Sequence, residues 1–76
     1  MRFSPGEYLQ DELRVRHWAV AAFAATTGIA PDTLIRLLAG EEPLTDDIAA
    51  RIGRALGTSA TLWRNLERAY RATEGE

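Results

Sequence analysis

The chain has 76 residues and a formal net charge of −2, which predicts one small domain over residues 1–76 and excludes a strongly basic protein that coats DNA. It has no cysteine and one histidine, His17, so it offers neither disulfides, nor a metal site, nor a catalytic constellation, and we expect no enzyme and no cofactor. No apolar run is long enough to cross a bilayer and the first residues do not resemble a secretory leader, so we expect a cytoplasmic protein with no membrane partner.

The first predicted helix begins after Ser4 and ends near Arg14 or Val15. Ser4 is a good N-cap, Pro5 suits the first helical position, and Glu7 completes the S-x-x-E pattern of a capping box. The acidic side chain of Glu7 also suits the positive end of the helix dipole.

The stretch 18–40 predicts a helix-turn-helix. Helices over 18–27 and 31–39 flank a short turn in which Gly28 can adopt a positive φ, and Gly40 is placed to end the second helix. In such a motif the second helix can enter the major groove of DNA. The alternative is a pair of packed helices in an all-α domain with no role on DNA.

The second helix of this motif has distinct inner and outer faces. Leu34, Leu37 and Leu38 form an apolar stripe that faces inward. The remaining side chains form the outer face, where any function of the motif must lie: Asp32, Thr33, Ile35, Arg36 and Ala39.

The inner face of the first motif helix can be assigned in two ways. Either Trp18 faces inward with the alanines, or Phe23 and Ala24 do, and in both cases we expect Val20 to lie toward the outside. The alanines concerned are Ala21, Ala22 and Ala25.

Two further helices follow. Thr45 is expected to cap a helix that ends at Gly57, with Gly53 at a close packing point, and Ser59 is expected to cap a C-terminal helix over about 59–72. We expect residues 72–76 to be frayed.

The C-terminal helix places Trp63, Leu66 and Tyr70 on one face. Large aromatic side chains on a terminal helix suit a dimer or partner interface, because aromatic residues are enriched at such sites. The alternative is that Trp63 fills the core. The sequence as a whole thus predicts an all-α fold of five helices with short connections.

The order of these motifs resembles the HigA-type antitoxins, a branch of the XRE, or lambda-repressor-like, helix-turn-helix group. The resemblance runs from Ser4 to Tyr70 and rests mainly on Pro-Gly-Glu at 5–7 and on the segment 51–70 with its R-A-L-G-T-S and L-W-x-N-L-x-x-A-Y patterns. It implies a five-helix protein, often a homodimer, that neutralises a HigB-like mRNA-cleaving toxin and represses its own operon.

Among the residues that the resemblance assigns to DNA, this chain keeps Thr33 and Arg36, with Arg16 and His17 as further candidates. Other positions depart from the family pattern: Ala19 and Val20 replace Ser-Gln, Ile35 replaces a polar residue, and Glu41 and Glu42 stand where a basic residue is usual. Because phosphate contacts supply much of the affinity, we expect DNA binding to be weak and salt-sensitive, or absent.

Two other functions remain open on the residues alone. One is a stand-alone, phage-type repressor, against which Glu41, Glu42, Ala19 and Val20 count. The other is a degenerate helix-turn-helix that serves as a protein-interaction module, with Val20 and Ile35 as exposed apolar contacts.

Overall fold

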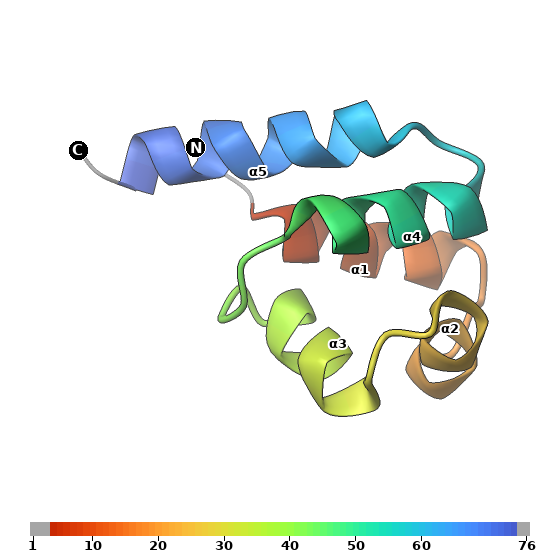
Figure 1. The fold of residues 1–76 in the computed structure, drawn as a ribbon. Helices are drawn as coiled ribbons and strands as arrows, with labels where there is room; N and C mark the ends of the chain where they lie inside the picture. The colour runs from red at the N-terminus through yellow and green to blue at the C-terminus, as the bar shows by residue number, and fades with distance from the viewer. Residues whose placement is uncertain (1–3, 75–76) are drawn as a thin grey trace.

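The computed structural model describes residues 4–74, which form five α-helices around one core (Figure 1). This confirms the predicted all-α fold. The helices are α1 (Pro5–Val15), α2 (Val20–Thr27), α3 (Pro31–Leu38), α4 (Asp46–Leu56) and α5 (Ala60–Glu74). The last helix runs two residues beyond the predicted end, so residues 72–74 are helical and not frayed, while 1–3 and 75–76 lie outside the described residues.

The helices stack in three tiers. Figure 1 shows α5 running back along α4 in the opposite direction, with the pair α2 and α3 below, and α1 contacts both α3 and α5. Buried apolar side chains come from all five helices and two connections: Leu9, Leu13, Phe23, Ala24, Ile29, Leu34, Leu37, Leu44, Ala49, Ile52, Leu56 and Trp63. One continuous core therefore supports the helix-turn-helix pair from above.

All three predicted N-caps are present. The hydroxyl of Ser4 accepts a hydrogen bond from the Glu7 amide at 3.2 Å, and that of Thr45 accepts one from the Ile48 amide at 3.2 Å. The Ser59 hydroxyl accepts one from the Leu62 amide at 3.1 Å. Each satisfies an amide at the start of its helix that has no partner within the helix.

The start of α2 differs from the prediction. The Trp18 amide donates to the Leu13 carbonyl at 2.9 Å, which keeps Trp18 in the connection after α1, and α2 begins at Val20. Trp18 instead packs its ring edge to face against Phe23, with ring centroids 4.9 Å apart.

The structure also decides which face of α2 points inward. Phe23 and Ala24 are buried, whereas the three alanines at 21, 22 and 25 are exposed. Val20 is half-buried and packs against the core, so the expectation that it lies outside is wrong. This orientation is favourable because burying part of the valine side chain removes apolar surface from water.

Trp63 is a core residue. Its side chain is 0% exposed, its indole nitrogen donates to the Thr58 hydroxyl at 2.8 Å, and its ring meets Tyr8 edge to face at 5.6 Å. The indole finds both an apolar site and a hydrogen-bond acceptor inside the domain. Of the predicted interface face, only the half-buried Leu66 and Tyr70 therefore remain within reach of a partner.

Residues 4–74 contain no helix with the length and apolar character needed to cross a bilayer. Over residues 4–72, whose side chains the structure describes, no three side chains of His, Cys, Asp or Glu gather closely enough to hold a metal ion.

Candidate nucleic-acid interface

The turn between α2 and α3 is held by hydrogen bonds from its own residues. Gly28 adopts φ 78°, as predicted, and its amide donates to the Ala24 carbonyl at 2.9 Å. The buried hydroxyl of Thr27 donates to the Phe23 carbonyl at 2.9 Å and accepts from the Ile29 amide at 3.3 Å. These bonds fix the path of the chain as it leaves α2 and enters α3.

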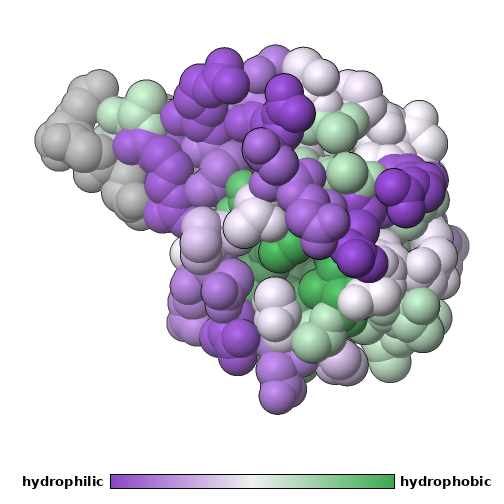
Figure 2. Space-filling view, in the orientation of Figure 1, coloured by the Kyte–Doolittle hydropathy of each residue, from purple (hydrophilic) through white to green (hydrophobic). Residues whose placement is uncertain are grey.

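Helix α4 also supports this turn. The Arg51 guanidinium donates from Nη1 to the Thr27 carbonyl at 2.9 Å and pairs through Nε with Asp47 at 2.9 Å. A hollow of about 190 Å³ lies between the turn and α4, and Figure 2 shows apolar surface in this region bordered by hydrophilic side chains. Thr33 lies at the edge of this hollow.

The outer face of α3 is open to solvent, as predicted. Asp32, Ile35, Arg36 and Ala39 are exposed, and Thr33 is half-buried. Ile35 is 57% exposed, which is unusual for a large aliphatic side chain on a helix whose other face already supplies Leu34 and Leu37 to the core. Thr33 and Arg36 stand one turn apart, so both can approach the same ligand.

Arg36 is not a free cation in this structure. Its Nε donates to Oε2 of Glu42 at 2.8 Å, and Glu42 belongs to the connection between α3 and α4. This hydrogen bond and the charge of Glu42 raise the pKa of Arg36 above its ordinary value, and the charges of Asp32 and Glu41 act in the same direction. The guanidinium therefore remains protonated at any physiological pH.

Arg16 and His17 lie elsewhere. The last turn of α3 packs on the first turn of α1, where Leu37 meets Gly6, whereas Arg16 caps the opposite end of α1, about 15 Å along the helix. Arg16 is bound to Glu12 through Nε at 3.2 Å and Nη2 at 3.0 Å. Thr33 and Arg36 thus share the outer side of α3, whereas Arg16 and His17 lie in the turn that follows α1.

The start of α2 carries no side-chain cap. Ala19 is the N-cap residue and makes no side-chain hydrogen bond, in agreement with its lack of a polar group. Neither Ala19 nor Val20 has a side-chain acceptor for the first amides of α2, which have no partner within the helix.

Two residues of this surface, Glu42 and Arg51, are not among the predicted site residues. Glu42 holds Arg36 from six positions along the chain, and Arg51 reaches the turn from 24 positions away. The sequence shows the charges of both, but their partners depend on how α4 and its preceding loop return to the motif.

Comparison with known proteins places the chain in a family. No family model matches it. It is 35% identical over 72 residues to the uncharacterized helix-turn-helix type transcriptional regulator YddM of Escherichia coli K12, covering 95% of this chain and 77% of that protein.

Solved structures agree with this. An antitoxin HigA of Pseudomonas aeruginosa, solved with the higBA promoter, superposes with a TM-score of 0.94 at 30% identity, over 99% of this chain and 83% of that one. PA4674 of the same species, solved in complex with its 28-base-pair operator DNA, gives a TM-score of 0.93 at 30% identity, over 99% and 84%. The chain therefore belongs to the family of HigA antitoxins and helix-turn-helix transcriptional regulators, which is not a family of enzymes.

Proposed function

We propose that this protein is an antitoxin that binds operator DNA through the outer face of α3, represses its own operon and neutralises a HigB-like mRNA-cleaving toxin. The observation that carries the DNA part is the presentation of Thr33 and Arg36 on an exposed helix whose entry turn is fixed by Thr27, Gly28 and Arg51. Two relatives of the same fold are solved with promoter or operator DNA. Both proposed partners act in the cytoplasm, so the function places the protein there.

Operator recognition by this motif is expected to need two copies of the chain. Helix-turn-helix proteins of this kind bind two half-sites about one helical turn of DNA apart, which a homodimer matches by symmetry. Leu66 and Tyr70 on α5 are the half-buried residues that we assign to the dimer or toxin interface, now without Trp63. Sedimentation of the purified chain at micromolar concentration tests the dimer, and a monomer at all concentrations contradicts it.

The toxin part is tested by co-expression. A toxin-like reading frame beside the gene is induced with and without this chain, and growth is followed together with a reporter driven by the operon's own promoter. We expect the chain to restore growth and to lower the reporter signal. Arg36→Ala is the matched variant: it removes a proposed DNA contact on α3 and leaves Leu66 and Tyr70 unchanged, so it should restore growth but release the reporter.

The same experiment separates the alternatives. Repression without restored growth favours a stand-alone repressor. Restored growth without repression favours a protein-interaction module, for which the exposure of Ile35 is the supporting observation. If the chain neither restores growth nor lowers the reporter signal, the whole proposal is contradicted.

A further inference from the structure

The pairing of Arg36 with Glu42 has a defined geometry. Glu42 reaches the guanidinium from the side, at Nε, with a separation of 2.8 Å. Among the residues whose side chains the structure describes, 4–72, none accepts a hydrogen bond from the two terminal nitrogens, Nη1 and Nη2. The contact therefore occupies one edge of the guanidinium and leaves its outer edge open.

The loop that carries Glu42 is tied to the end of α3. The Glu41 amide donates to the Arg36 carbonyl at 2.8 Å, and the Gly40 amide donates to the Leu37 carbonyl at 3.1 Å. Gly40 has φ 78°, the left-handed conformation that closes a helix in this way. The backbone next to Glu42 is thus fixed relative to Arg36, so their contact does not depend on a long mobile loop.

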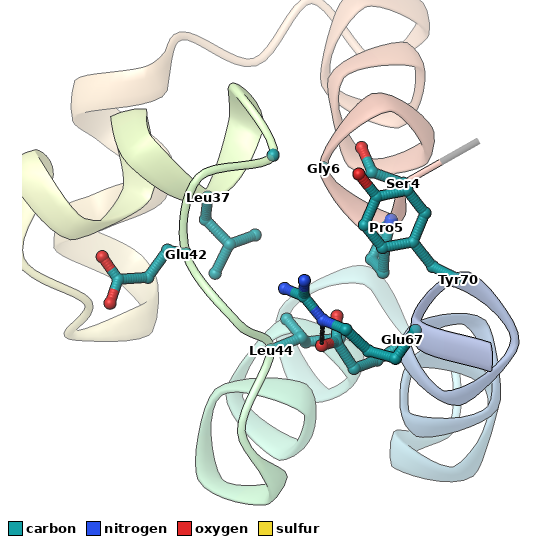
Figure 3. A pocket seen from close by; sticks show the side chains of 10 residues that line it. Ser4, Pro5, Gly6, Leu37, Glu42, Leu44, Glu67 and Tyr70 are labelled. Carbon is teal, nitrogen blue, oxygen red and sulfur yellow. Dashed lines mark hydrogen bonds and ion pairs between the residues drawn. The ribbon is translucent and has the colours of Figure 1, made fainter. Parts of the chain in front are cut away.

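The Glu42 side chain is directed at α3, where its partner Arg36 lies. Figure 3 shows its side chain extending away from Glu67 and Tyr70, on the other side of the loop. The arginine of that region, Arg71, is paired with Glu67 at 2.6 Å. Glu42 is therefore directed at α3 and not at α5.

An arginine held at Nε differs from a freely rotating one in what it can recognise. A flexible exposed arginine binds any phosphate as a cation, whereas a guanidinium of fixed orientation can donate two parallel hydrogen bonds to the O6 and N7 atoms of guanine. A neighbouring carboxylate also weakens attraction to phosphate at longer range, because the pair has no net charge. The geometry thus favours base recognition over non-specific attraction.

We infer that Glu42 is a positioning residue that directs the outer edge of Arg36 at a guanine in the operator, and so contributes sequence specificity without contacting a base itself. The inference rests on the proposed binding of operator DNA by α3. It assigns a role to an acidic residue that otherwise counts only as a repulsive charge near the DNA backbone.

The test compares two single-charge changes in the same loop. Glu42→Gln removes the charge and weakens the contact with Arg36, whereas Glu41→Gln removes a charge from the adjacent exposed position, whose side chain makes no hydrogen bond or ion pair with Arg36. Fluorescence anisotropy measures binding to the chain's own promoter fragment, to a set of fragments with each G·C pair changed to A·T, and to an unrelated duplex. The Arg36→Ala variant identifies the guanine that Arg36 recognises: it is the position at which changing G·C to A·T lowers the affinity of the unmodified chain but not that of the variant.

At that guanine we expect the unmodified chain to discriminate by roughly 5- to 150-fold. Glu42→Gln is expected to reduce this discrimination at least about threefold while raising affinity for the unrelated duplex. Glu41→Gln is expected to raise affinity for the unrelated duplex to a similar extent and to keep the discrimination. Circular dichroism of the three variants checks that each remains helical.

Two results would overturn the inference. If Glu42→Gln keeps the same discrimination as Glu41→Gln, Glu42 acts only as a charge and does not position Arg36, although the proposed function stands. If the unmodified chain does not bind the promoter fragment at all, the DNA part of the proposed function fails, and the inference fails with it.

Discussion

Gly6 of α1 lies directly against the main chain of Leu37 in α3. A Cβ atom built on Gly6 would meet the Leu37 carbonyl oxygen and come within 3.0 Å of the Leu38 Cα atom. Neither is the end of a flexible side chain that can move aside. The close approach of the two helices therefore requires glycine here, and it sets the position at which α3 presents Arg36.

Gly6→Ala should destabilise the domain by about 1–3 kcal/mol, because the added methyl group forces α1 and α3 apart in a packed core. Urea unfolding followed by circular dichroism measures the change. Gln10→Ala is the matched control, since Gln10 is exposed on the same helix and its truncation should be nearly neutral. Equal stability of the Gly6→Ala variant would mean that the helix contact is looser than described.

Trp63→Ala should leave little folded protein. Truncating a wholly buried tryptophan costs about 3–5 kcal/mol, which is comparable with the entire stability of a domain of this size. Helical circular dichroism at 25 °C, on dilute protein, measures the loss. Leu62→Ala changes the preceding, exposed residue and should retain the signal. A folded Trp63→Ala monomer that merely fails to dimerise would restore the interface role predicted from sequence.

Thr27→Val should destabilise the turn that leads into α3. Valine has nearly the same shape but cannot accept the hydrogen bond of the Ile29 amide, and an unpaired buried amide costs about 1–3 kcal/mol. Amide hydrogen exchange at Ile29 should become faster in this variant. Urea unfolding should show a correspondingly lower free energy of unfolding. Thr26→Val, one residue earlier and exposed, serves as the control. Unchanged exchange at Ile29 would show that its amide does not depend on Thr27.

The local features of this fold could be predicted from sequence. Ser4, Thr45 and Ser59 act as caps, and Gly28 and Gly40 adopt positive φ, because each depends only on residues within a few positions. The stripe of leucines on α3 is also a short-range pattern and faces the core as expected.

Features that depend on tertiary contacts could not be predicted in the same way. The sequence could not decide which face of α2 points inward, because alanine favours a helix without favouring either side. It could not place Trp63 in the core either, because that depends on contacts with Thr58 and Tyr8. At the candidate site, Arg36 could be identified from its helix position. Its partner Glu42 could not, because that contact depends on how the loop folds back.

The proposed function requires that α3 presents Arg36 to operator DNA. Anisotropy of the purified chain on its own promoter fragment, at about 50 mM and about 200 mM salt, tests it most directly. We predict binding that weakens roughly tenfold or more at the higher salt and that Arg36→Ala weakens by roughly a further tenfold or more. Binding that is insensitive to salt and to Arg36→Ala, in a variant that remains helical, would contradict the account.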